Sequence, residues 1–227
     1  MPTSPEFSAS VAPAHTRLDP ATPGTVYVVG DVHGCIAELR TLWDRLAPGH
    51  DDRVVFVGDL VCKGPASDDV VAFVQARDNA ISVRGNNEAV IVREGSKTGL
   101  SAASRDAVSS FPLVVSWDEK VVVHGGVHPD LPLGEQTPGD LLEMRAVPPG
   151  NGYDGPFWFE SYEGPPRVFF GHTVLAEPLV TEWAVGLDTG CVHGGKLTAY
   201  DCETEEVVSV SAERTYRPRS DDKVLHL

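Results

Sequence analysis

The chain has 227 residues, of which 41% are hydrophobic, and this length and composition predict a single globular domain with a substantial core. Its formal net charge of -15, from 33 acidic and 18 basic side chains, disfavours non-specific attraction to the polyanionic backbone of a nucleic acid. No apolar run approaches the roughly 20 residues that span a bilayer, and the N-terminal residues lack a basic stretch followed by an apolar core, so we expect a cytoplasmic protein.

Residues 1–24 contain five prolines among Ser, Thr and Ala without an apolar period, and this composition predicts a flexible N-terminal segment. From residue 25 onward, short β-branched runs alternate with amphipathic segments, which is the pattern of an α/β domain. We expect this domain to cover residues 25–212 and residues 213–227 to form a polar C-terminal tail.

The domain begins with two units that each consist of a strand, a loop and a helix. The strands are expected at Thr25–Val29 and Arg53–Val57, and the helices at Ile36–Leu46 and Asp68–Ala76. Each strand is followed directly by a Gly-Asp pair, which contains Asp31 in the first unit and Asp59 in the second. The repetition of this unit is typical of an α/β domain.

Three further short strands are each followed by glycine and a polar residue. They are expected at Ile81–Val83, Val121–Val123 and Val168–Phe170, and they lead to Asn86, His124 and His172. In open α/β sheets the crevice that binds ligands lies just beyond the carboxyl ends of the strands, so these side chains should converge. The alternating runs over Trp183–Ala212 predict antiparallel strands that complete a second sheet.

The converging side chains are carboxylates, imidazoles and one amide, which form a mixed nitrogen and oxygen ligand set. The set comprises Asp31, His33, Asp59, Asn86, His124 and His172. Such ligands suit Mn, Fe, Zn or Co and exclude the thiolate-rich class of structural zinc sites. Two cations about 4 Å apart can acidify a shared water and neutralise charge during an in-line displacement, so we expect hydrolysis of phosphate esters or anhydrides.

Five motifs in chain order carry a resemblance to a known family: GDVHG (30–34), GDLVCKGP (58–65), RGNNE (84–88), HGG (124–126) and GHT (171–173). The chain thereby resembles the calcineurin-like metallophosphoesterases of the phosphoprotein phosphatase superfamily. The stretch GLDTGCVHGGKLTAY (186–200) is similar to the ApaH-like, diadenosine-tetraphosphatase-like branch. The resemblance implies a catalytic domain with a four-layer α/β/β/α sandwich, two mixed sheets and a metal site at the carboxyl ends of the strands.

The resemblance also implies a role for each candidate residue. Asp31, His33 and Asp59 would hold the first divalent metal, and Asp59 would bridge to a second one, completed by Asn86, His124 and His172. Mn is the first choice for both ions, with Fe, Zn, Co or Mg as alternatives. Lys63 and Arg145 stand where family members grip phosphate, although lysine lacks the bidentate fork of arginine.

The chain departs from the family pattern at two positions. The family's D-R-G reads Cys62-Lys63-Gly64, and its G-N-H-E reads Gly85-Asn86-Asn87-Glu88. A general-acid histidine and its aspartate partner are therefore both missing, and Asn87 supplies no titrating proton. This loss penalises poor leaving groups such as a serine alkoxide most, so we favour phosphoanhydride substrates. His128 or His193 is a candidate substitute for the proton donor.

We therefore expect a two-metal hydrolase that uses a metal-bridging hydroxide on dinucleoside polyphosphates, nucleotides or polyphosphate. Two alternatives stay open, a phosphatase of phosphoserine, phosphothreonine or phosphotyrosine in proteins, and a weakened metal-binding module that recognises phosphorylated ligands. The expected partners are a phosphorylated small molecule or a phosphoprotein, without a membrane and without nucleic acid. The sequence carries no signal for the oligomeric state.

Overall fold

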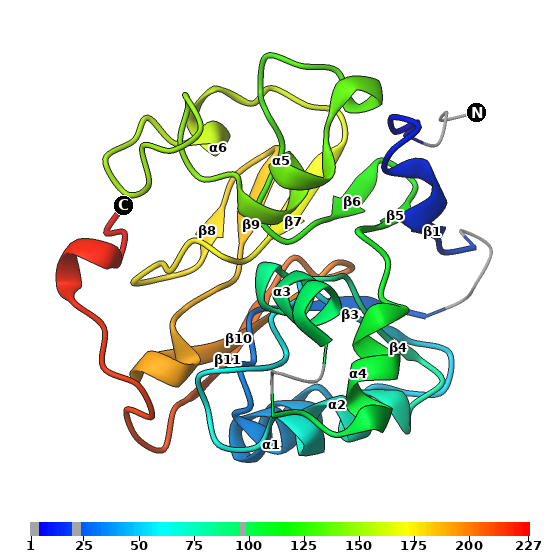
Figure 1. Cartoon of the computed structure of the whole chain (residues 1–227), viewed down its shortest axis with the longest axis vertical. Coiled ribbons are helices and arrows are strands. Elements are labelled where there is room, and N and C mark those ends of the chain that lie inside the picture. Colours follow the sequence, from blue (N-terminus) through cyan, green and yellow to red (C-terminus); the bar gives the residue numbers. More distant parts are fainter. Residues whose placement is uncertain (1–4, 20–23, 96–98) are drawn as a thin grey trace.

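The computed structural model describes residues 5–19, 24–95 and 99–227 (Figure 1). Within these residues the strands form a five-stranded and a six-stranded sheet. The first sheet has the order β11 (Val207–Ser211), β10 (Lys196–Asp201), β2 (Val26–Val29), β3 (Arg53–Phe56) and β4 (Ala80–Ser82). The second has the order β1 (His15–Arg17), β5 (Val114–Trp117), β6 (Lys120–Val122), β7 (Arg167–Phe170), β9 (Ala184–Gly186) and β8 (Leu179–Val180).

Helices cover the outer face of each sheet (Figure 1). The first sheet carries α1 (Ile36–Leu46), α2 (Ser67–Gln75), α3 (Asn86–Glu94) and α4 (Ala102–Ser109). The second carries the short helices α5 (Pro138–Glu143) and α6 (Trp158–Ser161). The molecule is therefore a four-layer α/β/β/α sandwich with two mixed sheets, as the family resemblance implied.

The central strands are apolar on both faces because each sheet is covered on both sides. In β3, Val55 joins the core between the two sheets, whereas Val54 and Phe56 pack against the helices of the first sheet. In β7, Phe169 lies between the sheets, and Phe170 packs with α5 and α6. The continuous apolar runs that predicted these strands thus reflect burial on two faces.

The strands after residue 183 are arranged differently from the expectation. We expected antiparallel strands that complete a second sheet, but β10 and β11 extend the first sheet, where β10 runs antiparallel to β2. In the second sheet, β9 pairs with β7 in the parallel direction. Alternation of apolar residues predicts a strand but does not specify which sheet edge it joins, and this explains the difference.

Both ends of the chain contribute to the fold beyond residues 25–212. Of the segment expected to be flexible, residues 1–4 and 20–23 lie outside the described residues, but β1 pairs with β5 and Val11 is fully buried. Near the other end, Tyr216 packs against the core between the first sheet and its helices, and Leu225 forms a β-bridge with Leu175. A few apolar side chains hold these segments against the domain. The residues around them are Pro-rich or polar, which is why the sequence did not predict these contacts.

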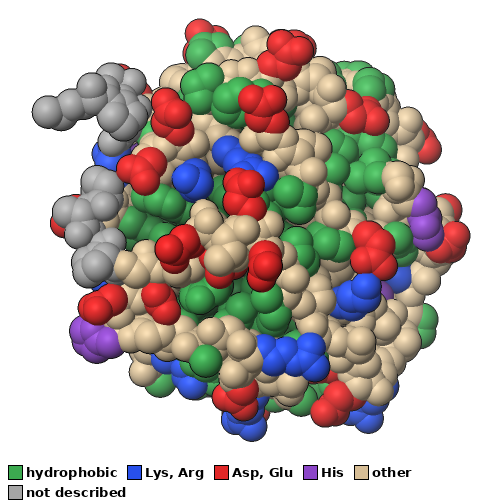
Figure 2. Space-filling view, turned by 180° about the vertical axis from the view of Figure 1, so that it is seen from behind, with side chains coloured by type: hydrophobic (Ala, Val, Ile, Leu, Met, Phe, Trp, Pro, Cys, Tyr) green, Lys and Arg blue, Asp and Glu red, His purple; other side chains and the backbone are tan. Residues whose placement is uncertain are grey.

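The surface agrees with the acidic composition. Carboxylates are spread over the face seen in Figure 2 and do not gather into one patch. Among the described residues, no helix is long and apolar enough to cross a bilayer.

Candidate metal centre

The six predicted ligands meet at the carboxyl ends of strands from both sheets. Asp31 and Asp59 follow β2 and β3, and His124 follows β6. Ligand atoms of these three residues all lie within 4.8 Å of one another, and all three side chains are buried. Two sheets therefore deliver their ligands to one centre.

The remaining three predicted ligands complete this group. The Nε2 atom of His33 lies 3.5 Å from Asp59 Oδ2. The Oδ1 atom of Asn86, at the start of α3, lies 3.0 Å from His124 Nε2 and 3.2 Å from His172 Nδ1. We refer to these six residues as the metal centre, because their mixed oxygen and nitrogen atoms form a ligand set typical of divalent cations.

Backbone carbonyls orient two of the imidazoles. His33 Nδ1 donates to the carbonyl oxygen of Val61 at 2.9 Å, and His124 Nδ1 donates to that of Val57 at 2.8 Å. Because a carbonyl oxygen can only accept, these bonds place the ring proton on Nδ1. Each Nε2 therefore carries a lone pair on the side of the ring that faces Asp59. The arrangement is the one that a metal-binding histidine requires.

Two glycines allow the loops to approach each other this closely. A Cβ atom on Gly85 would lie 2.2 Å from Asp59 Oδ1, and one on Gly171 would lie 2.0 Å from Asp31 Oδ1. Both distances are shorter than any non-bonded contact, so larger residues would displace the ligands. The glycines beside the predicted ligands are therefore required by packing at the centre.

The pKa values of the two buried aspartates at the metal centre are shifted in opposite directions. Burial, the nearby carboxylate of Asp188 and that of Asp59 raise the pKa of Asp31 well above its usual value. Burial also opposes ionisation of Asp59, but His124 and His33 hold the pKa of Asp59 below its usual range. Burial lowers the pKa of His33 to about 4 and keeps it neutral. A buried pair of carboxyl groups surrounded by imidazole nitrogens is an environment that a divalent cation would stabilise.

The two predicted phosphate-binding residues lie at this centre. Lys63 Nζ lies 2.6 Å from His33 Nε2. Arg145 donates from Nη2 to the carbonyl oxygen of His172 at 3.2 Å, and its guanidinium carbon lies 5.3 Å from the ring centroid of Tyr153. The structure therefore brings both cations to the ligand set.

Asn87 contacts the central carboxylate directly. Its backbone N–H donates to Asp59 Oδ1 at 2.9 Å, and its side-chain amide donates to Asp59 Oδ2. Burial and the charge of Glu88 raise the pKa of the Cys62 thiol to about 11, so Cys62 is a protonated loop residue and a poor nucleophile. Asn87 thus orients Asp59 but offers no titrating proton.

Comparison with known proteins identifies the family. The sequence profile of the calcineurin-like phosphoesterases matches residues 24–183. The chain belongs to the calcineurin-like phosphoesterase family. It is therefore a metal-dependent hydrolase of phosphoric ester or acid-anhydride bonds, and the family uses divalent metal ions.

Individual relatives of this phosphoesterase carry more specific names. An asymmetrical bis(5'-nucleosyl)-tetraphosphatase of Anoxybacillus flavithermus is 28% identical, over 83% of this chain and 95% of the relative. The protein of the same name from Halalkalibacterium halodurans is 30% identical, over 82% of this chain and 94% of the relative. The crystal structure of a candidate diadenosine tetraphosphatase matches with a TM-score of 0.79 and 30% identity, over 87% of this chain and 97% of that one.

Sequence reasoning did not assign a role to Glu88 of this phosphoesterase. Its carboxylate is fully buried and accepts from the backbone N–H groups of Asp59 at 2.9 Å, Gly85 at 2.8 Å and Val61 at 3.3 Å. Burial and the charge of Asp59 raise its pKa to about 8. Glu88 joins the loop after β3 to the start of α3, and its place three residues after the helix N-cap was the available signal.

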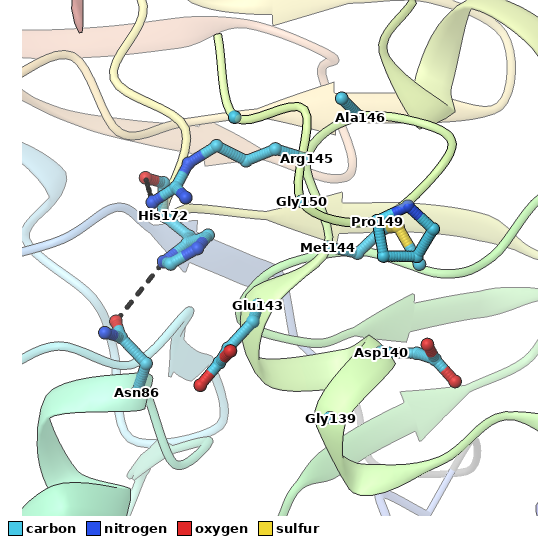
Figure 3. A pocket seen from close by; sticks show the side chains of 11 residues that line it. Asn86, Gly139, Asp140, Glu143, Met144, Arg145, Ala146, Pro149, Gly150 and His172 are labelled. Atoms are coloured by element: carbon cyan, nitrogen blue, oxygen red, sulfur yellow. Dashed lines mark hydrogen bonds between the residues drawn. The ribbon is translucent and has the colours of Figure 1, made fainter. Parts of the chain in front are cut away.

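A cavity of about 560 Å³ opens beside the centre, and we call it the metal-side cavity (Figure 3). Asn86, His172 and Arg145 line its inner end. Asp140 and Glu143 lie farther along α5, and Figure 3 shows the Glu143 carboxylate reaching toward Asn86. The cavity combines one guanidinium with two carboxylates, so it can accept a phosphoryl group only near Arg145.

Proposed function

We propose that this phosphoesterase hydrolyses phosphoanhydride bonds in dinucleoside polyphosphates, nucleotides or polyphosphate. The observation that carries the proposal is the contact of Asn87 with Asp59, which puts an amide beside the central carboxylate at a position where the family pattern has a proton donor. Phosphoanhydride leaving groups depart with delocalised negative charge and need a proton donor less than an alkoxide does. The names of the tetraphosphatase relatives support the same substrate class.

Two divalent cations fit the centre, with Mn as first choice. Asp31, His33 and Asp59 would hold one, and Asp59 with Asn86, His124 and His172 would hold the other. When bound, the cations would acidify a water and neutralise charge on the phosphoryl oxygens. His33 Nε2 has a single lone pair, which can bind either the metal ion or Lys63. With a metal ion bound, Lys63 would therefore leave His33 and bind phosphate.

The chain's own cations orient the substrate in this proposal. Arg145, held by the His172 carbonyl and the Tyr153 ring, would bind a phosphoryl oxygen with its planar guanidinium. Lys63 would compensate charge that develops on the bridging oxygen as the bond breaks. Both actions stabilise negative charge without transferring a proton.

The histidines considered as substitute proton donors do not favour an alkyl ester. His193 Nδ1 donates to the carbonyl oxygen of Arg217 at 2.7 Å, so the neutral ring has a bare Nε2, and burial lowers its pKa. A neutral His193 accepts protons but has none to offer at Nε2. His128 accepts from the backbone N–H of Asp130 and does not line the metal-side cavity. Departure of a stabilised leaving group therefore fits the chain best.

The test is metal-dependent hydrolysis by purified protein reloaded with Mn, Fe, Zn, Co or Mg, measured as nucleotide products for the dinucleotide and as released phosphate for the other substrates. The substrates are diadenosine tetraphosphate, polyphosphate, p-nitrophenyl phosphate and a phosphoserine peptide. We expect kcat/KM for an anhydride to exceed that for the peptide by at least about 100-fold, because an absent general acid costs about that much for a poor leaving group. Asp59→Asn should abolish turnover, and exposed Asp44→Asn is the matched control.

Two outcomes contradict the proposal. Faster turnover of the phosphopeptide would favour a protein phosphatase. Phosphate binding without turnover under every metal would favour the binding module.

A further inference from the structure

The last described segment of the chain crosses from one sheet to the other. Residues 213–225, here called the strap, begin beside the first sheet, where the backbone N–H groups of Tyr216 and Arg217 donate to Val192 at 3.1 and 2.9 Å. The strap ends beside the second sheet, where Leu225 N–H donates to the carbonyl of Val174 at 2.8 Å. Figure 1 shows this red segment along the edge of both sheets. Its two ends are fixed by backbone hydrogen bonds.

Between those ends, the strap covers a second cavity of about 500 Å³, here called the strap cavity. Lys63 and Asn87 line its inner end, so it adjoins the metal centre from a side that the metal-side cavity does not share. Its lining comprises Cys62, Lys63, Asn87, His193, Arg217, Pro218, Arg219, Ser220 and Lys223. These residues include four permanent cations and no carboxylate, in a chain whose net charge is -15.

Arg219 is held in a defined position within this cavity. Its Nε donates to the carbonyl of Lys223 at 2.6 Å, and its Nη2 donates to the hydroxyl of Tyr153 at 2.9 Å. That hydroxyl also accepts from the backbone of Val174, which fixes the tyrosine. The Tyr153 ring centroid lies 5.4 Å from the Arg219 guanidinium and 5.3 Å from that of Arg145. Tyr153 thus positions one arginine of each cavity.

Two further cations of the strap cavity, Arg217 and Lys223, are available to bind an anion. Arg217 and Lys223 are exposed, and their side chains carry no hydrogen bond or ion pair among those of the described residues. The neighbouring carboxylate of Asp221 pairs with His226 and does not line the cavity. The cavity therefore offers a row of cations that starts at Lys63 and is not neutralised by its own lining.

We propose that the strap cavity binds the phosphates that lie beyond the scissile bond in substrates with an extended polyphosphate chain. Given the proposed function, the reacting phosphoryl group sits at the metal centre, and the rest of the chain must leave on one side. Asp140 and Glu143 repel a polyanion from the metal-side cavity, whereas Lys63, Arg217, Arg219 and Lys223 attract it to the strap cavity. The strap thereby selects substrates by the number of phosphates.

The test replaces Arg217 and Lys223 together by glutamine, leaves Arg219 in place because Tyr153 links it to Arg145, and measures kinetics on diadenosine tetraphosphate and p-nitrophenyl phosphate with metal-loaded protein. We expect KM for the tetraphosphate to rise at least about tenfold, since each partly exposed contact contributes a few-fold. Kinetics on p-nitrophenyl phosphate, which has one phosphate, should change less than about twofold. Arg214→Gln is the matched control, because Arg214 lies on the strap, outside the lining, and stacks on Tyr216.

A binding measurement separates this inference from the proposed function. Calorimetry compares tripolyphosphate with orthophosphate on metal-loaded wild type and variant, at equal free metal, so that chelation affects both proteins alike. Loss of tripolyphosphate affinity alone supports the strap cavity even if the tetraphosphate is not a substrate. Equal loss for both anions, the same loss in Arg214→Gln, or unchanged tripolyphosphate affinity overturns it. Lys223→Gln alone repeats the test if the double variant is not folded, as judged by circular dichroism.

Discussion

Glu88 is the single side chain on which the geometry of the metal centre depends most directly. We expect Glu88→Ala to lower the free energy of unfolding by about 3 kcal/mol, because three buried backbone donors lose their acceptor. Glu88→Gln should cost less, since an amide oxygen still accepts. Urea denaturation measures both. Glu94→Ala, on the exposed face of the same helix, is the control, and an equal loss there would contradict the expectation.

Asn87 and Cys62 mark the residue-scale difference from the family pattern, and both line the strap cavity. We expect Cys62→Asp combined with Asn87→His to raise the rate on alkyl phosphates by about tenfold or more, because an imidazole held by a carboxylate supplies the missing proton. Aryl phosphates should gain less than about threefold, since their leaving groups need little protonation. Steady-state rates on matched alkyl and aryl monoesters measure the difference. Equal gains would reject the leaving-group argument.

The candidate ligands could be expected from the sequence to converge, because each lies close to the end of a short apolar strand and to a glycine. That local pattern identifies Asp31 and Asp59 without any knowledge of distant contacts. The roles of Glu88 and Tyr153 depend on backbone groups and cations brought together by folding. No local pattern encodes those partners, so the candidate ligands are easier to predict from the sequence than the residues that orient them.

At the scale of elements, β1 shows that a Pro-rich segment can still carry a structural strand. Val11 is fully buried against the second sheet, and we expect Val11→Ala to cost about 1 to 3 kcal/mol through a cavity at this site. Val207→Ala, at a position 39% exposed, should change the free energy of unfolding by less than about 0.5 kcal/mol. Chemical denaturation of both variants provides the comparison. Similar small effects would mean that the N-terminal segment contributes no packing energy.

The helices and central strands were predictable from the sequence because their apolar periods are long and uninterrupted. The predicted helix over Ile36–Leu46 coincides with α1, and the predicted strand over Arg53–Val57 contains β3. The placement of β10 and β11 was not predictable, because pairing between strands far apart in sequence depends on which edges the rest of the fold leaves free.

At the scale of the whole molecule, the metal centre joins the two sheets, since Asp31 and Asp59 follow the first and His124 and His172 the second. We therefore expect metal loading to raise Tm by about 10 °C over chelator-treated protein, as two ions well above their dissociation constants stabilise the folded state by about 5 kcal/mol. Differential scanning calorimetry measures the shift. Asp59→Asn should show a smaller one, and an unchanged Tm in wild type would exclude such a link.

The Tyr153 ring has a consequence for how this protein can be altered. Its contacts with Arg145 and Arg219 would couple the proposed binding of the reacting phosphoryl group to a cation of the strap. A designer who wishes to retune phosphate-chain preference could therefore vary Lys223, which is exposed and makes no contact with that ring, while Arg145 stays in place. Changes at Arg219 would reach Arg145 through this ring, so Arg219 and Lys223 offer unequal freedom for redesign.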